Sequence, residues 1–137
     1  MNSNDKPWEH EPDHLLFMSE AGYICEIKRH QWGHLCGYIF IPFGHPDYGK
    51  TNLGLGGAAP DVHGGWTFSD THGDGDDEDG GKYTVFGFDC NHHGDYSPGT
   101  GANLPSYTFN TAHYKTIEFV VNQLEQAAKQ FKERATP

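Results

Sequence analysis

The densest group of side chains able to bind metal or move protons lies between Gly87 and Asp95. In the run GFDCNHHGD, Asp89, His92 and Asp95 follow one another at three-residue intervals. In a turn or short helical stretch this spacing aims all three side chains at one point, and such a mixed nitrogen and oxygen set suits zinc, manganese or iron. In the alternative interpretation, the aspartates accept hydrogen bonds from the turn backbone while His92 packs or faces water.

A second candidate is His63, which is followed directly by Gly64 and Gly65. Glycines weaken a strand unless a ligand or another backbone must come close. If residues 61–69 and 82–90 pair as a hairpin with His63 opposite Phe88, His63 lies beside Asp89. His63, Asp89 and His92 would then hold a divalent metal, zinc or manganese. The competing interpretation is a buried, hydrogen-bonded histidine, with the glycines making room for an aromatic ring.

A third candidate is the segment GHPDYGK, residues 44–50, which places His45 and Tyr48 in a long loop. Both side chains suit contact with a ligand, and His45 suits a general acid or a phosphate contact. Taken alone, however, the segment is an ordinary Pro-Asp turn.

Composition narrows the function classes. The chain has 19 acidic and 9 basic residues and a net charge of −10, which opposes binding to duplex nucleic acid. No stretch approaches the roughly 18 consecutive apolar residues of a membrane span, so we expect a cytoplasmic protein without a membrane partner. The sequence contains no Walker loop, nucleophile elbow or dinucleotide fingerprint, and its three cysteines do not suggest a disulfide framework.

The elements that must position these residues indicate an α+β fold. Alternating apolar residues in 23–29 and the apolar run in 34–42 predict an antiparallel hairpin, and 61–69 and 82–90 predict a second one. The run from Tyr38 to Ile41 suggests a strand covered on both faces. Long glycine-rich loops join these strands, and an acidic connector follows the third.

The C-terminal segment from about residue 112 to 134 predicts an amphipathic helix that packs on the sheet. Its apolar positions recur at helical spacing, and basic residues near its end favour the helix dipole. We expect Ile117, Val121, Leu124 and Phe131 to be buried. The predicted organisation is a weakly ordered lead-in, residues 1–13, and one domain, residues 14–137, with a sheet of at least four strands.

Three motifs in this order resemble a family of small, mostly uncharacterised proteins of tailed phages and prophages: CGYIFIPFGHPDYGK, VHGGWTFS and FGFDCNHHGDYSP. The similarity covers about residues 22–130 and ends in the C-terminal helix. The long acidic insertion at 70–80 departs from the family pattern. The resemblance implies a phage accessory protein in the host cytoplasm, a setting in which small proteins counter defences based on nucleotide signals.

Three functions remain open. The first is a divalent-metal hydrolase for a small phosphorylated or nucleotide-like ligand, with the metal on His63, Asp89 and His92. In it, Asp95 orients a ligand or acts as general base, and His45 is an acid or a phosphate contact. The second is a non-catalytic protein, possible as a homo-oligomer, that sequesters such a ligand. His45, His63, Tyr48 and the amides of Gly64 and Gly65 would surround it. The third is a virion or host-protein interaction module.

Overall fold

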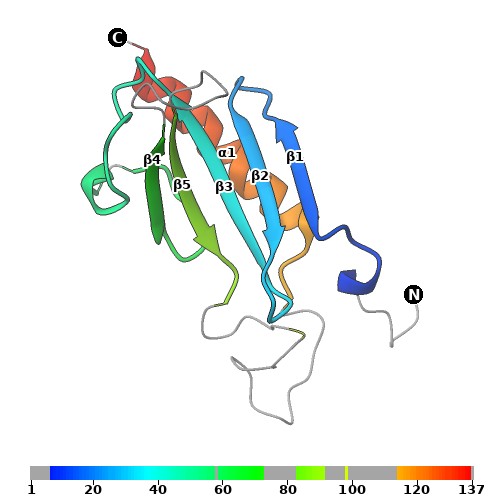
Figure 1. Ribbon diagram of the computed structural model, residues 1–137. Coiled ribbons are helices and arrows are strands. Elements are labelled where there is room, and N and C mark those ends of the chain that lie inside the picture. Colours follow the sequence, from blue (N-terminus) through cyan, green and yellow to red (C-terminus); the bar gives the residue numbers. More distant parts are fainter. Residues whose placement is uncertain (1–6, 58, 73–82, 92–97, 99–113, 137) are drawn as a thin grey trace.

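The computed structural model describes residues 7–57, 59–72, 83–91, 98 and 114–136. One antiparallel sheet and one long helix form the α+β fold that the sequence predicts (Figure 1). No helix in these residues is long and apolar enough to cross a membrane. In chain order the elements are η1 (Pro7–Glu9), β1 (His14–Met18), β2 (Ile24–Arg29), β3 (Leu35–Pro42), η2 (Leu53–Leu55), β4 (Phe68–His72), β5 (Tyr83–Asp89) and α1 (Ile117–Ala135).

The sheet has five strands in the order β1-β2-β3-β5-β4, and each neighbouring pair is antiparallel. The predicted first hairpin is confirmed as β2 and β3. In its register Cys25 pairs with Ile39 and Cys36 pairs with Lys28, so the two cysteines do not face each other. All three cysteines are free thiols.

The second hairpin forms between β4 and β5, but the expected register is wrong. β4 begins at Phe68, which pairs with Gly87. The expected register, with His63 opposite Phe88, would have placed Phe68 opposite Tyr83, four residues away. The physical reason lies upstream, where Gly64 and Gly65 adopt φ of 73° and 81° and turn the chain. Such angles favour glycine and do not continue a strand. Residues 61–67 therefore precede the strand instead of forming its first half.

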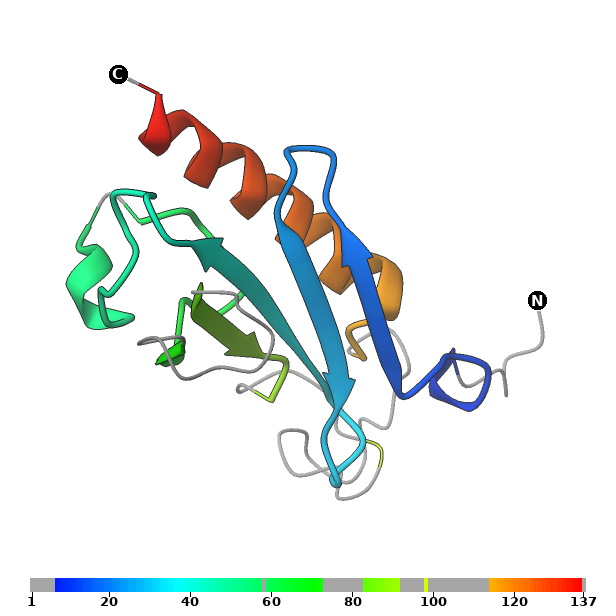
Figure 2. The same ribbon diagram turned by 45° about the horizontal axis from the view of Figure 1, so that its top comes forward.

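The two faces of the sheet have different surroundings. Helix α1 lies across one face over β2 and β3 (Figure 2). Because successive strand residues point to opposite faces, the buried positions of β3 that alternate from Leu35 to Ile41 face this helix. We call the other face, which carries Cys36, Tyr38 and Phe40, the outer face.

Helix α1 begins at a capped N-terminus, where the Thr116 side chain accepts a hydrogen bond from the Phe119 amide at 3.2 Å. Leu124 and Phe131 are buried, as predicted, whereas Ile117 and Val121 are only partly buried. The fully buried helix positions are Val120, Leu124, Ala127, Ala128 and Phe131.

The segment before β1, which the sequence places in a weakly ordered lead-in, is tied to the start of the helix. Glu11 accepts hydrogen bonds from the Tyr114 hydroxyl at 2.6 Å and from the Ile117 amide at 2.8 Å. Arg29 donates to Asp13 at 2.7 Å and to the Tyr114 hydroxyl at 2.7 Å. These contacts fix one end of α1 on the sheet.

Candidate functional site

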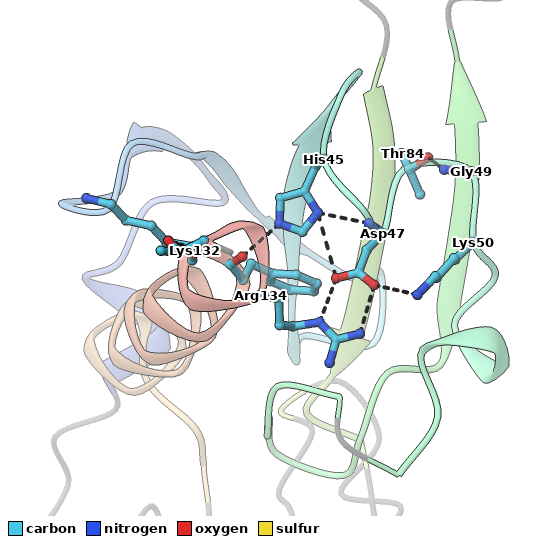
Figure 3. Close-up of polar contacts among 9 residues, drawn as sticks. His45, Asp47, Gly49, Lys50, Thr84, Lys132 and Arg134 are labelled. Carbon is cyan, nitrogen blue, oxygen red and sulfur yellow. Dashed lines mark hydrogen bonds and ion pairs between the residues drawn. The ribbon is translucent and has the colours of Figure 1, made fainter.

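A buried carboxylate, Asp47, is the centre of a polar cluster at the C-terminal end of α1 (Figure 3). Its side chain is 1% exposed and accepts hydrogen bonds from Arg134 Nε at 2.6 Å, Arg134 Nη2 at 2.8 Å and Lys50 Nζ at 2.9 Å. The Arg134 hydrogen bonds outweigh the opposing effect of burial and, with Lys50, lower the pKa of Asp47 to about 2. Asp47 is therefore ionised and paired, which fits a structural role.

The neighbouring His45 is buried, and both of its ring nitrogens meet backbone groups. Nε2 lies 2.7 Å from the Phe131 carbonyl oxygen, and Nδ1 lies 3.0 Å from the Asp47 amide nitrogen. Because a carbonyl only accepts and an amide N–H only donates, Nε2 carries the hydrogen and Nδ1 accepts. The ring also makes edge contacts with Tyr23 and Phe131, each at 5.9 Å between centroids. His45 thus joins its loop to the helix.

The whole loop 44–50 follows the end of β3, and this position corrects one expectation. The hydrolase hypothesis places His45 in one site with Asp89, but Asp89 pairs with Cys36 at the beginning of β3. At about 3.3 Å per residue, the two ends of β3 are about 20 Å apart. Tyr48 packs against the residue that precedes the loop, with its ring centroid 5.3 Å from that of Phe43. These contacts lend no support to a catalytic His45.

His63 lies on the helix side of the sheet. Its amide donates to Gln123 Oε1 at 2.7 Å, and its ring meets the Phe119 ring edge-on at 5.3 Å. The glycines that follow supply the turn described above, with the Gly65 amide bonded to the Val62 carbonyl oxygen at 2.9 Å. The reason for the Gly-Gly pair is therefore backbone conformation at a turn packed against α1.

Asp89 ends β5 with its side chain on the outer face, because Phe86 and Phe88 of the same strand are buried under the helix. Its carboxylate accepts a hydrogen bond from the Asn91 amide at 3.0 Å. His63 and Asp89 therefore lie on opposite faces, and the structure does not bring them together. His92 and Asp95 lie outside the described residues. Among the described residues, no three His, Cys, Asp or Glu side chains are arranged to hold a metal ion.

The feature that sequence reasoning missed is a hollow of about 220 Å³ on the outer face, which we call the outer-face groove. Strands β3 and β4 contribute aromatic rings to it, and the rings of Tyr38 and Phe68 meet edge-on at 5.8 Å. Phe68 is 46% exposed. The described lining consists of Glu26, Lys28, Tyr38, Phe40, Phe68, His72 and Val85.

Two glycines in the middle of the sheet allow these rings to lie close to the backbone. A Cβ at Gly87 would lie 2.6 Å from Tyr38 Cδ1, so the Tyr38 ring rests against this glycine on the outer face. A Cβ at Gly37 would lie 2.8 Å from Phe88 Cε1 on the helix side. Because Gly37 pairs with Phe88 and Tyr38 pairs with Gly87, each strand gives a glycine to its partner's ring. The glycines of GYIF and GFD thereby shape the groove and the core.

Charges surround the rings of the outer-face groove. Lys28 Nζ lies 5.6 Å from the centroid of the Tyr38 ring, within the range of a cation–π contact. Glu26 Oε2 lies 2.6 Å from His14 Nε2, and His72 Nε2 lies 3.0 Å from Asp70 Oδ2. Burial raises the pKa of Tyr38 to about 12, and nearby Cys36 adds to the effect. The phenol is therefore a neutral hydrogen-bonding group at physiological pH.

Comparison with known proteins does not assign the chain to a family. Family models, curated protein sequences and solved structures all lack a match to this chain. The candidate site consequently rests on the geometry of the chain itself.

Two other hollows share no lining residue with the outer-face groove. One, of about 340 Å³, lies beside Trp66 and several glycines, including the predicted Gly65. Its polar groups are used internally, because Trp66 Nε1 donates to Pro60 and Asn52 bonds to Ser69. The Trp66 ring also packs against core phenylalanines. The other, of about 350 Å³, is lined by Glu20, Ala21, Lys129, Lys132, Glu133 and Thr136.

Proposed function

We propose that this protein is a non-catalytic binding module that holds a small nucleotide-like ligand in the outer-face groove. The observation that carries the proposal is the arrangement of Tyr38, Phe40 and Phe68 around one hollow on a sheet face, with Lys28 beside them. Aromatic rings on a rigid sheet are stacking surfaces for a planar base.

The size of the groove favours one ring system. Its volume of about 220 Å³ lies below the roughly 300–1,000 Å³ of pockets for drug-sized ligands. A single base with a short phosphorylated tail protruding from the groove fits this space better than a dinucleotide.

The charges favour a compact ligand over a polymer. The net charge of −10 repels a long polyanion, whereas one phosphate needs only a local cation. Lys28 supplies that cation next to Tyr38, and the His72 side chain lies elsewhere in the lining. A base on the rings with a phosphate near Lys28 is the binding mode that we propose.

Sequestration is better supported than cleavage. Glu26, the only carboxylate in the described lining, is already bonded to His14. A metal-dependent hydrolase would depend on His92 and Asp95, outside the described residues, and its other ligands His63 and Asp89 lie on opposite faces. In the phage setting that the sequence resemblance implies, the proposed role is to remove a host nucleotide signal from solution.

The test is calorimetric titration with linear and cyclic mononucleotides, comparing the wild type with Phe68→Ala. Loss of one stacking ring, worth roughly 1–3 kcal/mol, should weaken binding roughly 5- to 150-fold. Phe43→Ala is the matched control, because Phe43 is another exposed phenylalanine, 65% exposed, beside Tyr48 and outside the groove. It should bind like the wild type.

After titration, the protein is denatured and the ligand is examined by chromatography. Unchanged ligand supports sequestration, and a new product would refute it in favour of an enzyme. Absence of binding by the whole panel, or equal weakening by Phe43→Ala, would refute the groove as the site.

A further inference from the structure

Strand β1 forms one edge of the sheet and lacks the usual features that prevent an edge strand from pairing with another chain. β1 has the sequence HLLFM and is the first strand in the sheet order, so β2 is its one neighbour among the described strands. Natural edge strands are commonly protected by lysine, proline or a bulge, and β1 has none of these. Figure 1 shows β1 as the last strand on its side of the sheet.

The hydrogen bonds at both ends of β1 show which backbone groups point outward. The Arg29 amide donates to the Asp13 carbonyl at 2.8 Å, and the Ser19 amide donates to the Tyr23 carbonyl at 2.8 Å. In an antiparallel pair, alternate residues face the neighbouring strand. The odd-numbered residues therefore bond to β2, and the N–H and C=O groups of His14, Leu16 and Met18 point away from the sheet. Within the described part of the chain, no backbone hydrogen bond to these outward groups is present.

Two of these three residues carry exposed apolar side chains. Leu16 is 59% exposed and Met18 is 61% exposed, and both lie on the outer face. The strand carries no acidic or lysine side chain, although the molecule as a whole has a net charge of −10. Two copies that meet along β1 thus bring no acidic side chain of either strand into the contact.

We propose that β1 pairs with β1 of a second copy in antiparallel fashion about a twofold axis at Leu16. Leu16 then lies opposite the partner's Leu16, and His14 lies opposite the partner's Met18. The outward N–H and C=O groups of three residues on each strand match in this register, which gives six hydrogen bonds. This contact is self-complementary, as a twofold interface requires.

The paired sheet has ten strands, with both helices on one side and both outer-face grooves on the other. The exposed Leu16 and Met18 of each copy then pack across the new strand pair. This proposal stands apart from ligand binding, because neither residue lines the groove.

The first test is mass measurement by light scattering over a range of protein concentrations. We expect the wild type to approach twice the monomer mass of 15.3 kDa as concentration rises. Leu16→Lys places two like charges opposite each other and should raise the dissociation constant at least about tenfold. Leu53→Lys is the matched control, because Leu53 is 87% exposed and far from β1 in the chain.

The second test examines the register by oxidation of variants that each carry one added cysteine, with the wild type and its three cysteines as the control. Leu16→Cys places the two sulfur-bearing residues opposite each other, with Cα atoms about 5.5 Å apart, which permits a disulfide. Met18→Cys places them about 14 Å apart, because they are offset by four residues. Only Leu16→Cys should form a covalent dimer.

Several results would overturn the proposal. These are a monomeric wild type at all concentrations, an undiminished dimer in Leu16→Lys, or crosslinking of Met18→Cys to the same extent as Leu16→Cys. Nucleotide titration of Leu16→Lys separates the two proposals, since a monomer that still binds ligand leaves the groove assignment intact.

Discussion

Replacing Asp47 with asparagine removes a buried charge and keeps the size of the side chain. In the folded protein the Arg134 and Lys50 hydrogen bonds hold the pKa of Asp47 at about 2, against an ordinary value of 3.8. Each tenfold change in proton affinity is worth about 1.4 kcal/mol, so the ionised carboxylate contributes about 2 kcal/mol to folding. We expect Asp47→Asn to lose this amount at pH 7, which corresponds to about 7 °C in Tm for a chain of this length.

The pH dependence gives the sharper signature. Because the pKa is lower in the folded state, the stabilisation is complete above about pH 4 and is lost as the pH falls towards 2. The difference between the wild type and Asp47→Asn should therefore be largest near neutral pH and close at low pH. Asp61→Asn is the control, because Asp61 is exposed and the substitution changes the net charge by the same amount.

Urea denaturation at pH 7, 4, 3 and 2.5, followed by tryptophan fluorescence, measures the free energy of unfolding of all three proteins. Equal stability of Asp47→Asn and Asp61→Asn at pH 7 would contradict a stabilising role of the Asp47 charge. A difference between them that does not narrow in acid would contradict it as well.

Two further substitutions test the packing and the capping described above. Gly87→Ala brings a Cβ to 2.6 Å from Tyr38 Cδ1. It should lower the free energy of unfolding, measured by thermal denaturation, by about 1–3 kcal/mol. Gly57→Ala, where a Cβ meets nothing within 4 Å, should cost far less, and equal losses would contradict the account of the ring contact. Thr116→Ala removes the cap on the Phe119 amide and should cost about 1 kcal/mol in a urea titration, with Thr116→Ser restoring most of it; failure of serine to do so would argue against a capping role.

Local patterns in the sequence were sufficient for the helix and for the first hairpin. The apolar spacing from Ile117 to Phe131 has the period of a helix, and the alternation in 23–29 has the period of a strand. β1 gave no such signal, because four of its five residues are apolar and do not alternate. The register of the second hairpin was wrong because the glycine turn at 64–65 was interpreted as part of a strand.

The candidate site could not be predicted in the same way. In the outer-face groove, Tyr38 and Phe68 meet because both pair with Gly87 of β5, which lies between β3 and β4, and Lys28 joins them from β2. Sequence spacing does not reveal that strand order. Asp47 and Arg134 are 87 positions apart, so their ion pair also depends on where the helix ends on the sheet. The histidine motifs drew attention to the loops, whereas the groove is built from side chains that read as ordinary strand residues.

The reciprocal glycine and aromatic contacts between β3 and β5 provide two spectroscopic reporters. The α-hydrogen of Gly87 that takes the place of a Cβ points at the Tyr38 ring, and that of Gly37 points at the Phe88 ring. Aromatic ring currents should displace both resonances from ordinary glycine positions in an NMR spectrum. Because the two glycines report from opposite faces, a ligand in the groove should move the Gly87 signal alone, while loosening of α1 should move the Gly37 signal. One spectrum of the labelled protein thus distinguishes occupancy of the groove from a change in the core.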